Sequence, residues 1–255
     1  MRIIMISKRT IRMLFISVML IGLFGVTFSW RMSRNVISAI PIWRANIIKE
    51  ADTKEKVIAL TFDDGPSPSF TSKILDLLKI YNAKGTFFII GEQAEKMPDL
   101  VKRQIKEGHE IGNHMYRHRE VFQMPIPEIK ADLEQSNQVI RSITGKKIRL
   151  YRPTSGYYNE SIVGMAWGLE YLVVLWSIDS KDWSGLKPSS IALKILKTVK
   201  PGSIILFHDL GGYRDTTVKT LEIILPELAR RGYRCLTISQ LLERAGHTYF
   251  TSNKD

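Results

Sequence analysis

Cysteine is almost absent from this 255-residue sequence: the only one is Cys235, so the chain cannot form an internal disulfide. The apolar run from Tyr233 to Ile238 predicts a buried thiol that packs as a small hydrophobe. The sequence also lacks an internal repeat, a low-complexity tract and a long Lys/Arg run outside the N-terminal segment. That last absence argues against a nucleic-acid-binding domain. The remaining composition, 44% hydrophobic and 24% charged, is that of a globular protein with room for one large domain and an appendage.

The N-terminal segment has the pattern of a membrane anchor. Residues 13–30 form a charge-free, mostly apolar run of 18 residues, just long enough to cross about 30 Å of hydrocarbon. Basic residues precede the run directly, which favours a cytoplasmic N-terminus and an extracytoplasmic C-terminal domain. We therefore predict a cytoplasmic basic segment at 1–12, a transmembrane anchor at 13–30 and a single-pass location in the cell membrane.

Two alternatives stay open for this segment. A cleaved signal peptide would make the domain a secreted protein. The apolar core of such a peptide usually spans about 7–15 residues before a small-residue cleavage site. This run is longer and ends in Thr27-Phe28-Ser29-Trp30, a poor cleavage site. A buried core helix is the other alternative.

The rest of the chain alternates between short apolar runs and helical patterns. A connector of mixed polarity at 31–54 precedes this part, and a polar tail follows at 247–255. Several runs are continuously apolar, as expected of parallel strands covered on both faces. The predicted strands are 57–62, 85–90, 109–112, 148–151, 171–176, 203–207 and 233–238, and the predicted helices are 70–81, 98–107, 127–142, 159–168, 188–200, 216–231 and 239–245. This predicts an α/β domain over 55–246: a distorted, closed or incomplete (β/α) barrel of about seven parallel strands. An open doubly wound sheet is the alternative.

Ionisable residues stand where the predicted strands end. Asp63 and Asp64 follow the first strand, in Thr61-Phe62-Asp63-Asp64-Gly65-Pro66, and two buried carboxylates need a cationic partner. The later strands are followed, in order, by His114 and His118, by Arg152, by Asp179 and Asp182-Trp183, and by His208-Asp209. In parallel α/β folds these strand ends share one face, where active sites are built. Five strand ends therefore predict one site that contains a metal ion.

Each motif has a plainer reading when it stands alone. Asp-Asp-Gly-Pro favours a turn, and the spacing of His114 and His118 places both rings on one side of a helical turn whether or not a metal is bound. Arg152 before Pro153 has the pattern of a surface cation. Asp182 and His208 can each be read as an ordinary loop or strand-end residue. Their order and their common position favour a site.

Five segments together resemble the five ordered motifs of the polysaccharide deacetylases, carbohydrate esterase family 4, which share a NodB-homology domain. The segments are Thr61–Pro66, Gly112-Asn113-His114-x-x-x-His118, Arg152-Pro153-x-x-Gly156, Asp179-x-x-Asp182-Trp183 and Leu206-x-His208-Asp209. The resemblance covers roughly residues 55–242. It implies a distorted β/α barrel and a metal-dependent deacetylase that acts on polymeric sugars.

The resemblance implies that Asp64, His114 and His118 are the metal ligands, a set that leaves positions open for water and substrate. Zinc is the expected ion, with Co²⁺, Mn²⁺, Ni²⁺ and Fe²⁺ as alternatives. It also implies that Asp63 is the general base and that Arg152 pairs with it, which keeps it ionised and oriented.

The other half of the implied site is the proton donor and the pocket wall. His208 would be the general acid, and Asp182 would hold it and raise its pKa. Leu206 and Trp183 would line the pocket for the acetyl methyl group. The backbone N–H of Ser155 would complete the oxyanion site.

The chain departs from the family pattern at two places. Met115 follows the first ligand histidine, where Ser or Thr is usual, and such outer contacts of a metal site can be worth about 10–100-fold. Thr154-Ser155 stand where Pro and an aromatic residue are usual, which puts the stiffness of that loop and a sugar-stacking surface in question. Both changes concern efficiency and substrate choice, not the reaction class.

We therefore predict a metal-dependent hydrolase that removes N-acetyl groups from an extracytoplasmic polysaccharide. The expected substrate is the N-acetylglucosamine-type residues of peptidoglycan, or chito-oligosaccharide, and we expect no nucleic-acid partner. A non-catalytic glycan-binding module on a degenerate barrel and an O-acetyl esterase are the alternatives. His109 is expected to be structural, and Trp43, Trp167 and Trp176 are expected to pack rather than to stack on sugars.

Overall fold

The computed structural model describes residues 47–211 and 214–247, so the predicted anchor at 13–30 lies outside the described part of the chain. Within that part, no helix is both long enough and apolar enough to cross a membrane. The strands are β1 (Ile47–Ile48), β2 (Val57–Asp63), β3 (Gly85–Ile89), β4 (Glu110–Asn113), β5 (Leu150–Tyr151), β6 (Leu172–Val174), β7 (Ile178–Asp179), β8 (Ile204–His208) and β9 (Arg234–Leu236). The helices are α2 (Thr71–Ile80), α3 (Gly91–Lys96), α4 (Pro98–Lys106), α5 (Ile126–Thr144), α6 (Glu160–Gly168), α7 (Pro188–Thr198), α8 (Arg214–Arg230) and α9 (Ile238–Arg244), with short 3₁₀ turns η2 (Val121–Gln123) and η3 (Thr154–Gly156).

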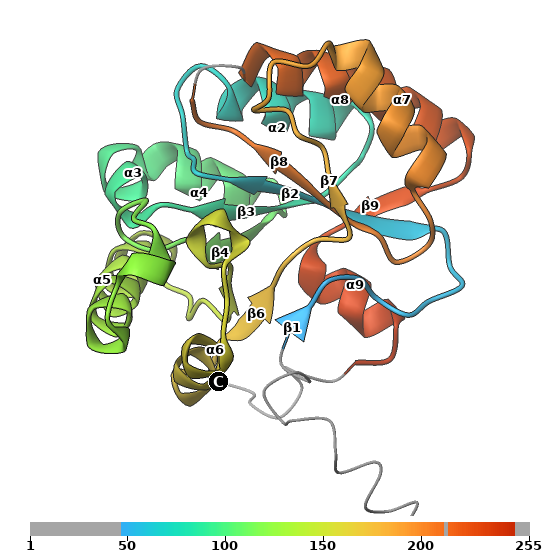
Figure 1. The fold of residues 1–255 in the computed structure, drawn as a ribbon. Helices are drawn as coiled ribbons and strands as arrows, with labels where there is room; N and C mark the ends of the chain where they lie inside the picture. Colours follow the sequence, from blue (N-terminus) through green and yellow to red (C-terminus); the bar gives the residue numbers. More distant parts are fainter. Residues whose placement is uncertain (1–46, 212–213, 248–255) are drawn as a thin grey trace, which may run out of the picture. The chain divides into compact units, whose positions relative to one another are not determined.

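The strands form one curled parallel sheet with all of the described helices except α9 on its outside (Figure 1). The strand order is β1-β6-β5-β4-β3-β2-β8-β7, and β9 pairs beside the first half of β2. Every ladder between these strands is parallel. No ladder joins β1 to β7 in the described residues, so the barrel is incomplete. The prediction of a parallel, incomplete barrel is confirmed.

Two strands and one helix lie outside the predicted set. All seven predicted strands are present, but β1 and β7 bring the total among the described residues to nine. Strand β1 lies within the stretch interpreted as a connector and pairs with β6. Helix α3 is short and polar, with the sequence GEQAEK, and has no apolar period that would reveal it.

Strand β2 brings Asp63 to the inner face of the sheet because its side chains alternate between the two faces. All seven of its residues are buried. Val57 and Ala59 belong to the apolar cluster inside the curled sheet. Successive side chains of a strand point to opposite faces, so Thr61 and Asp63 lie on the same inner face, further along. The inner face of β2 therefore changes from apolar to polar toward its carboxyl end.

Helix α9 closes the opposite, amino-terminal end of the curled sheet. A capping box between Thr237 and Gln240 starts the helix. Its apolar residues pack into a cluster with inner-face residues of several strands, and Figure 1 shows the helix below β9 and beside β1. The cluster consists of Ile48, Ala51, Val57, Ala59, Phe88, Leu150, Leu172, Val174, Ile204, Ile238, Leu241 and Leu242. One end of the barrel is therefore filled, and the other is left for a pocket.

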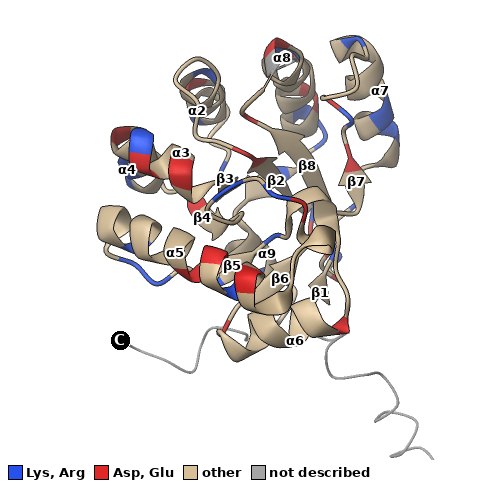
Figure 2. Ribbon diagram, turned by 60° about the vertical axis from the view of Figure 1, so that its left-hand side comes forward, with Lys and Arg blue, Asp and Glu red and all other residues tan. Residues whose placement is uncertain are grey.

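The outer helices carry both signs of charge. Figure 2 shows acidic and basic residues interspersed on α2, α4 and α8. Surface pairs such as Arg103 with Asp76 link neighbouring helices. Exposed pairs of this kind contribute little to stability, so the fold depends on its apolar interior.

Candidate active site

One open pocket of about 370 Å³ lies at the carboxyl ends of the strands, within the size range of small-ligand sites. Of the ten residues predicted for the site, eight line it: Asp63, Asp64, His114, His118, Ser155, Trp183, Leu206 and His208. The other two, Arg152 and Asp182, are fully buried and hydrogen-bond to Asp63 and His208. Gly156, Trp176 and Asp179 also line the pocket. The strand ends thus bring all ten predicted residues together.

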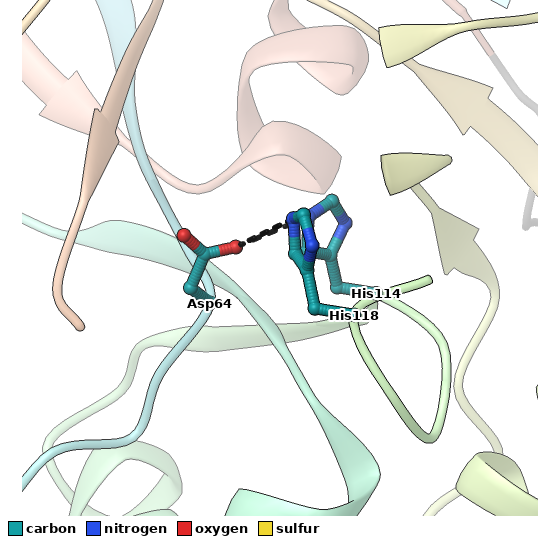
Figure 3. A group of neighbouring side chains, drawn as sticks. All are labelled: Asp64, His114 and His118. Atoms are coloured by element: carbon teal, nitrogen blue, oxygen red, sulfur yellow. Dashed lines mark ion pairs between the residues drawn. The ribbon is translucent and has the colours of Figure 1, made fainter. Parts of the chain in front are cut away.

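Asp64, His114 and His118 converge on a common point (Figure 3). Oδ1 of Asp64 lies 3.5 Å from Nε2 of His114 and 3.5 Å from Nε2 of His118. The three candidate ligand atoms all lie within 4.8 Å of one another. Around a tetrahedral zinc ion, ligand atoms are roughly 3.3–3.6 Å apart. Oδ1 of Asp64 is also buried with no hydrogen-bond partner among the described residues, so a cation would satisfy it. The residues present fit a divalent metal.

The ring of His114 is fixed with its free nitrogen facing this point. Nδ1 of His114 lies 2.7 Å from the Arg152 carbonyl oxygen, which can only accept a hydrogen bond. Nδ1 therefore carries a proton, and Nε2 is the ring nitrogen that faces Asp64.

The prediction that a helical turn places the two histidines is wrong. The chain after β4 is irregular from His114 to Glu120, and Met115 has the left-handed backbone angle φ = 76°. His114 and His118 converge because this loop folds back, with their ring centroids 5.7 Å apart.

Asp64 is the anionic member of the cluster. Burial by itself raises the pKa of Asp64, but the proximity and charge of His114, with the charges of His208 and His118, outweigh it and lower the pKa to about 2. Asp64 is therefore a carboxylate at neutral pH. Oδ2 of the neighbouring Asp63 lies 3.8 Å from Nε2 of His114, so Asp63 borders the cluster.

Arg152 fixes Asp63 from behind. Its Nη1 donates to Oδ1 of Asp63 at 2.7 Å and to Oγ1 of Thr61 at 2.8 Å. Its Nε and Nη2 donate to the carbonyl oxygens of Val174 and Leu175, each at 2.9 Å. The guanidinium is fully buried, so these bonds leave little freedom for Asp63 Oδ1, while Oδ2 faces the cluster.

Asp209, to which the sequence analysis gave no role, holds the backbone around the Asp63–Asp64 pair. Its N–H donates to the Asp63 carbonyl at 3.0 Å, and its Oδ1 accepts from the Gly65 N–H at 2.9 Å. Its Oδ2 accepts from Oγ1 of Thr71 at 2.6 Å. A Cβ on Gly65 would lie 2.2 Å from the Asp209 oxygens, so this close approach requires glycine. The two bonds flank Asp64, whose φ of 80° is costly for a residue other than glycine.

His208 and Asp182 form a second hydrogen-bonded pair in the site, after Asp63 and Arg152. Asp182 Oδ1 lies 2.8 Å from Nδ1 of His208, and Asp182 Oδ2 accepts from the His208 N–H at 2.9 Å and from Oγ1 of Thr217 at 2.6 Å. Burial by itself lowers the pKa of His208. The hydrogen bond and charge of Asp182, with the charges of Asp63 and Asp64, outweigh burial and raise the pKa.

The pocket wall combines buried and exposed groups. Leu206 is buried, whereas the Trp183 side chain is 51% exposed. Ser155 adopts φ = 56° within η3. Trp176 was predicted to pack. Its ring packs so closely on Gly156 that a Cβ on that glycine would lie 2.4 Å from it. Trp176 also lines the pocket.

Met115, the first departure from the family pattern, is part of the interior. Its side chain is fully buried, and the Tyr151 hydroxyl contacts its Sδ at 3.6 Å. Its N–H donates to Oδ1 of Asn113 at 2.9 Å. In this chain the position supports the His114 loop through packing and backbone contacts.

Residues predicted to lie outside the site behave mostly as expected. Cys235 is buried, and burial raises the pKa of its thiol to about 12. His109 is structural, since its Nδ1 accepts from the Gly85 N–H at 3.1 Å. Trp167 is 53% exposed on α6, contrary to the packing prediction, and Trp43 lies outside the described residues.

Comparison with known proteins places this chain in a family. The model of the polysaccharide deacetylase family matches residues 50–174. A peptidoglycan-N-acetylglucosamine deacetylase of Bacillus cereus is 42% identical over 195 residues, which cover 76% of this chain and 91% of that protein. A chitooligosaccharide deacetylase of Rhizobium leguminosarum bv. trifolii is 33% identical over 222 residues, which cover 81% of this chain and 99% of that protein.

Solved structures agree on the fold. The Bc1960 peptidoglycan N-acetylglucosamine deacetylase superposes with a TM-score of 0.75 at 36% identity, over 78% of this chain and 93% of that one. A second structure, BA3943 of Bacillus anthracis, described as a CE4 family pseudoenzyme, superposes with a TM-score of 0.72 at 26% identity, over 78% and 69% of the respective chains.

Proposed function

The chain belongs to the polysaccharide deacetylase family, and we propose that it is a metal-dependent hydrolase that removes N-acetyl groups from extracytoplasmic polysaccharide. The proposed substrate is the N-acetylglucosamine-type residues of peptidoglycan, with chito-oligosaccharide as the second candidate, in line with the names of similar proteins. The observation that carries the proposal is the buried Oδ1 of Asp64. It has no hydrogen bond among the described residues and is 3.5 Å from each of two imidazole nitrogens.

Asp64, His114 and His118 would hold the metal, with zinc as the first candidate. An ion bound there supplies a positive charge that polarises the acetyl carbonyl and makes water more acidic. Two imidazoles and one carboxylate leave coordination positions open, as catalytic sites require.

Asp63 would be the general base. Arg152 engages Oδ1 of Asp63, so Oδ2 is the oxygen that faces the pocket and accepts the proton of the attacking water. The N–H of Ser155, on the pocket wall, would donate to the oxygen that gains negative charge.

His208 would be the general acid. Asp182 engages Nδ1 of His208, which leaves Nε2 to deliver a proton to the departing nitrogen. The raised pKa of His208 increases the fraction of imidazolium at neutral pH. Water adds to the acyl carbon, the C–N bond breaks, and the products are acetate and the free amine.

A non-catalytic glycan-binding role is the second candidate, because one protein of similar fold is a pseudoenzyme. The gathering of base, acid and candidate ligands in one pocket favours catalysis in this chain. An O-acetyl esterase would use the same groups, and the relative rates on O-acetyl and N-acetyl sugars separate the two.

The test is acetate release by the purified full-length protein supplied with Zn²⁺ or Co²⁺. Peptidoglycan and acetylated chito-oligosaccharides are the substrates, and bound metal is measured on the same sample. We expect acetate from at least one substrate. Absence of acetate from both, with metal bound, would contradict the proposed function.

We also propose that residues 13–30 hold the catalytic domain outside the cytoplasm, or direct its secretion if they are cleaved. The support is the charge-free apolar run preceded by basic residues. Protease digestion of intact spheroplasts should remove the domain. Protection from protease would contradict this location.

A further inference from the structure

Two loops at the rim of the pocket are joined by three side-chain contacts with a constant spacing in sequence. Each contact joins a residue of the loop that follows His118 to the residue 35 positions later. Oγ1 of Thr154 donates to the Arg119 carbonyl, Oγ of Ser155 donates to Oε2 of Glu120 at 2.8 Å, and the ring of Tyr157 meets the ring of Phe122 edge to face at 5.8 Å. The loop that carries a candidate metal ligand is thereby joined to the loop that carries the candidate oxyanion donor.

Thr154 and Ser155, whose hydroxyls make the first two contacts, are also the second place where the chain departs from the family pattern. Thr154 and Ser155 replace the Pro and the aromatic residue that are usual there. Thr154 is fully buried, and its hydroxyl bonds to the facing loop. This loop is therefore held by hydrogen bonds at the positions where the family pattern has Pro and an aromatic residue, and its aromatic side chain is Tyr157, which contacts Phe122.

The Phe122–Tyr157 pair is exposed although it is apolar. Phe122 is 54% exposed and Tyr157 is 42% exposed. In the described residues this is the only ring-to-ring contact in which both side chains are exposed. Paired exposed aromatic rings at a pocket rim are a common surface for ligand contact.

The pair lies next to the pocket. Ser155 and Gly156 line the pocket, and Tyr157 follows them directly. Two residues of chain span at most about 7 Å, which is on the scale of one hexose unit. A polymer bound with one acetyl group at the metal cluster would thus bring a neighbouring sugar to the pair.

We propose that Phe122 and Tyr157 form a stacking subsite for the sugar next to the one whose acetyl group is hydrolysed. A pyranose ring presents an apolar C–H face, which packs against an aromatic ring, and hydroxyls at its edge, which suit the polar groups of Glu120 and Ser155. The occupant is an N-acetylhexosamine of the same glycan chain. This inference rests on the proposed function and names the part of the substrate that the rim selects.

The test compares a short and a long substrate. Full-length protein loaded with Zn²⁺ is assayed on N-acetylglucosamine, which brings no neighbouring sugar, and on penta-N-acetylchitopentaose, as wild type, Phe122→Ala, Tyr157→Ala and Tyr157→Phe. Each Ala variant should raise KM for the pentamer about 3–10-fold, with kcat within about twofold and KM for the monosaccharide unchanged. Tyr157→Phe keeps the ring and should restore the wild-type KM. Trp167→Ala, an aromatic of similar exposure on α6 that belongs to neither rim loop, is the matched control and should change neither value.

A KM increase that is equal on the monosaccharide and the pentamer would overturn the subsite, because it would mean that the pair only positions the loop. An unchanged KM on both would overturn it as well. A binding measurement keeps this result separate from the proposed function: affinity for the pentamer is measured by calorimetry in the Asp63→Asn background. Weaker binding of the Ala variants there supports the subsite even if no protein releases acetate, and equal binding overturns it.

Discussion

The back of the pocket and its rim differ in how deeply their side chains are buried and in how those side chains are held. At the back, Arg152, Asp182 and Asp209 are fully buried, and each is hydrogen-bonded to a residue that touches or flanks the pocket. At the rim, Trp183 and the Phe122–Tyr157 pair are about half exposed and stand on loops. Buried polar groups persist only when they are satisfied, so the back tolerates little change. Exposed rings on loops can change without such a cost, so the rim is where substrate choice can vary.

The largest effect is expected from substituting Arg152, at the back of the pocket. Arg152→Met removes the guanidinium and leaves Asp63 buried without its donor. We expect the free energy of unfolding to fall by about 3–5 kcal/mol, together with loss of detectable acetate release. Urea unfolding followed by tryptophan fluorescence measures the first. Arg234→Met, which breaks an exposed pair with Glu55, is the control and should cost less than about 1 kcal/mol. Equal losses in the two variants would remove the distinction between back and surface.

The next effect separates proton transfer from metal binding. Asp63→Asn should lower kcat by about 10²–10⁴-fold while bound zinc stays at the wild-type level, because Asp63 borders the cluster without being one of the three converging ligands. His118→Ala should lose zinc. Metal analysis of the purified variants and acetate release are the measurements. Full activity in Asp63→Asn would show that another group is the base.

The third effect is a shift in pH dependence. Asp182 raises the pKa of His208 against the opposing effect of burial, so Asp182→Asn should lower that pKa. The imidazolium is then lost at lower pH, and the alkaline limb of the kcat/KM profile should move to lower pH. Activity should therefore fall more at pH 8 than at pH 6.

Asp179→Asn is the control for this shift. Asp179 is a carboxylate in the same pocket whose Oδ1 accepts from the Lys181 N–H. It should leave the position of the alkaline limb unchanged. An unmoved limb in Asp182→Asn would assign the limb to a group other than His208.

The smallest effect is expected at the rim. Ser155→Ala removes the hydroxyl that bonds Glu120 but keeps the backbone N–H that faces the pocket. KM and kcat should each stay within about threefold, as for an ordinary surface substitution. Steady-state kinetics on chito-oligosaccharide measures both. A 100-fold loss of kcat/KM would show that this hydroxyl matters as much as the buried groups at the back of the site.

Much of the fold and of the back of the site could be predicted from the sequence. The runs that became β2, β3 and β8 are long and continuously apolar, so their carboxyl ends could be located, and with them Asp63 and His208. Because parallel strands end on one face, strand order predicted that the ionisable residues of the site lie together, whereas Ser155, Trp183 and Leu206 entered through the resemblance to the family. The functional roles of these residues stay predictions.

The elements that were missed carry too little local signal. Strands β1 and β7 have two residues each and no measurable period. The support that Asp209 gives to Gly65 joins positions 144 residues apart and depends on how β8 lies against β2. The contacts between the rim loops have the same origin, since they join segments 35 residues apart that meet only in the folded domain. The convergence of His114 and His118 in a loop depends on the backbone of Met115, which composition does not reveal.

The place of β2 in the sheet has a consequence for biosynthesis. The candidate ligands Asp64, His114 and His118 are all encoded before β5, whereas β8 and β9, which pair with β2, come from the last quarter of the chain. A polypeptide that emerges from the ribosome amino end first has therefore presented its ion-binding groups long before His208 exists to accompany them. Under the proposed roles, an incomplete chain holds the candidate ligands but lacks both the proton donor and the strand that supports Asp64, so hydrolytic competence would arrive only when β8 pairs with β2.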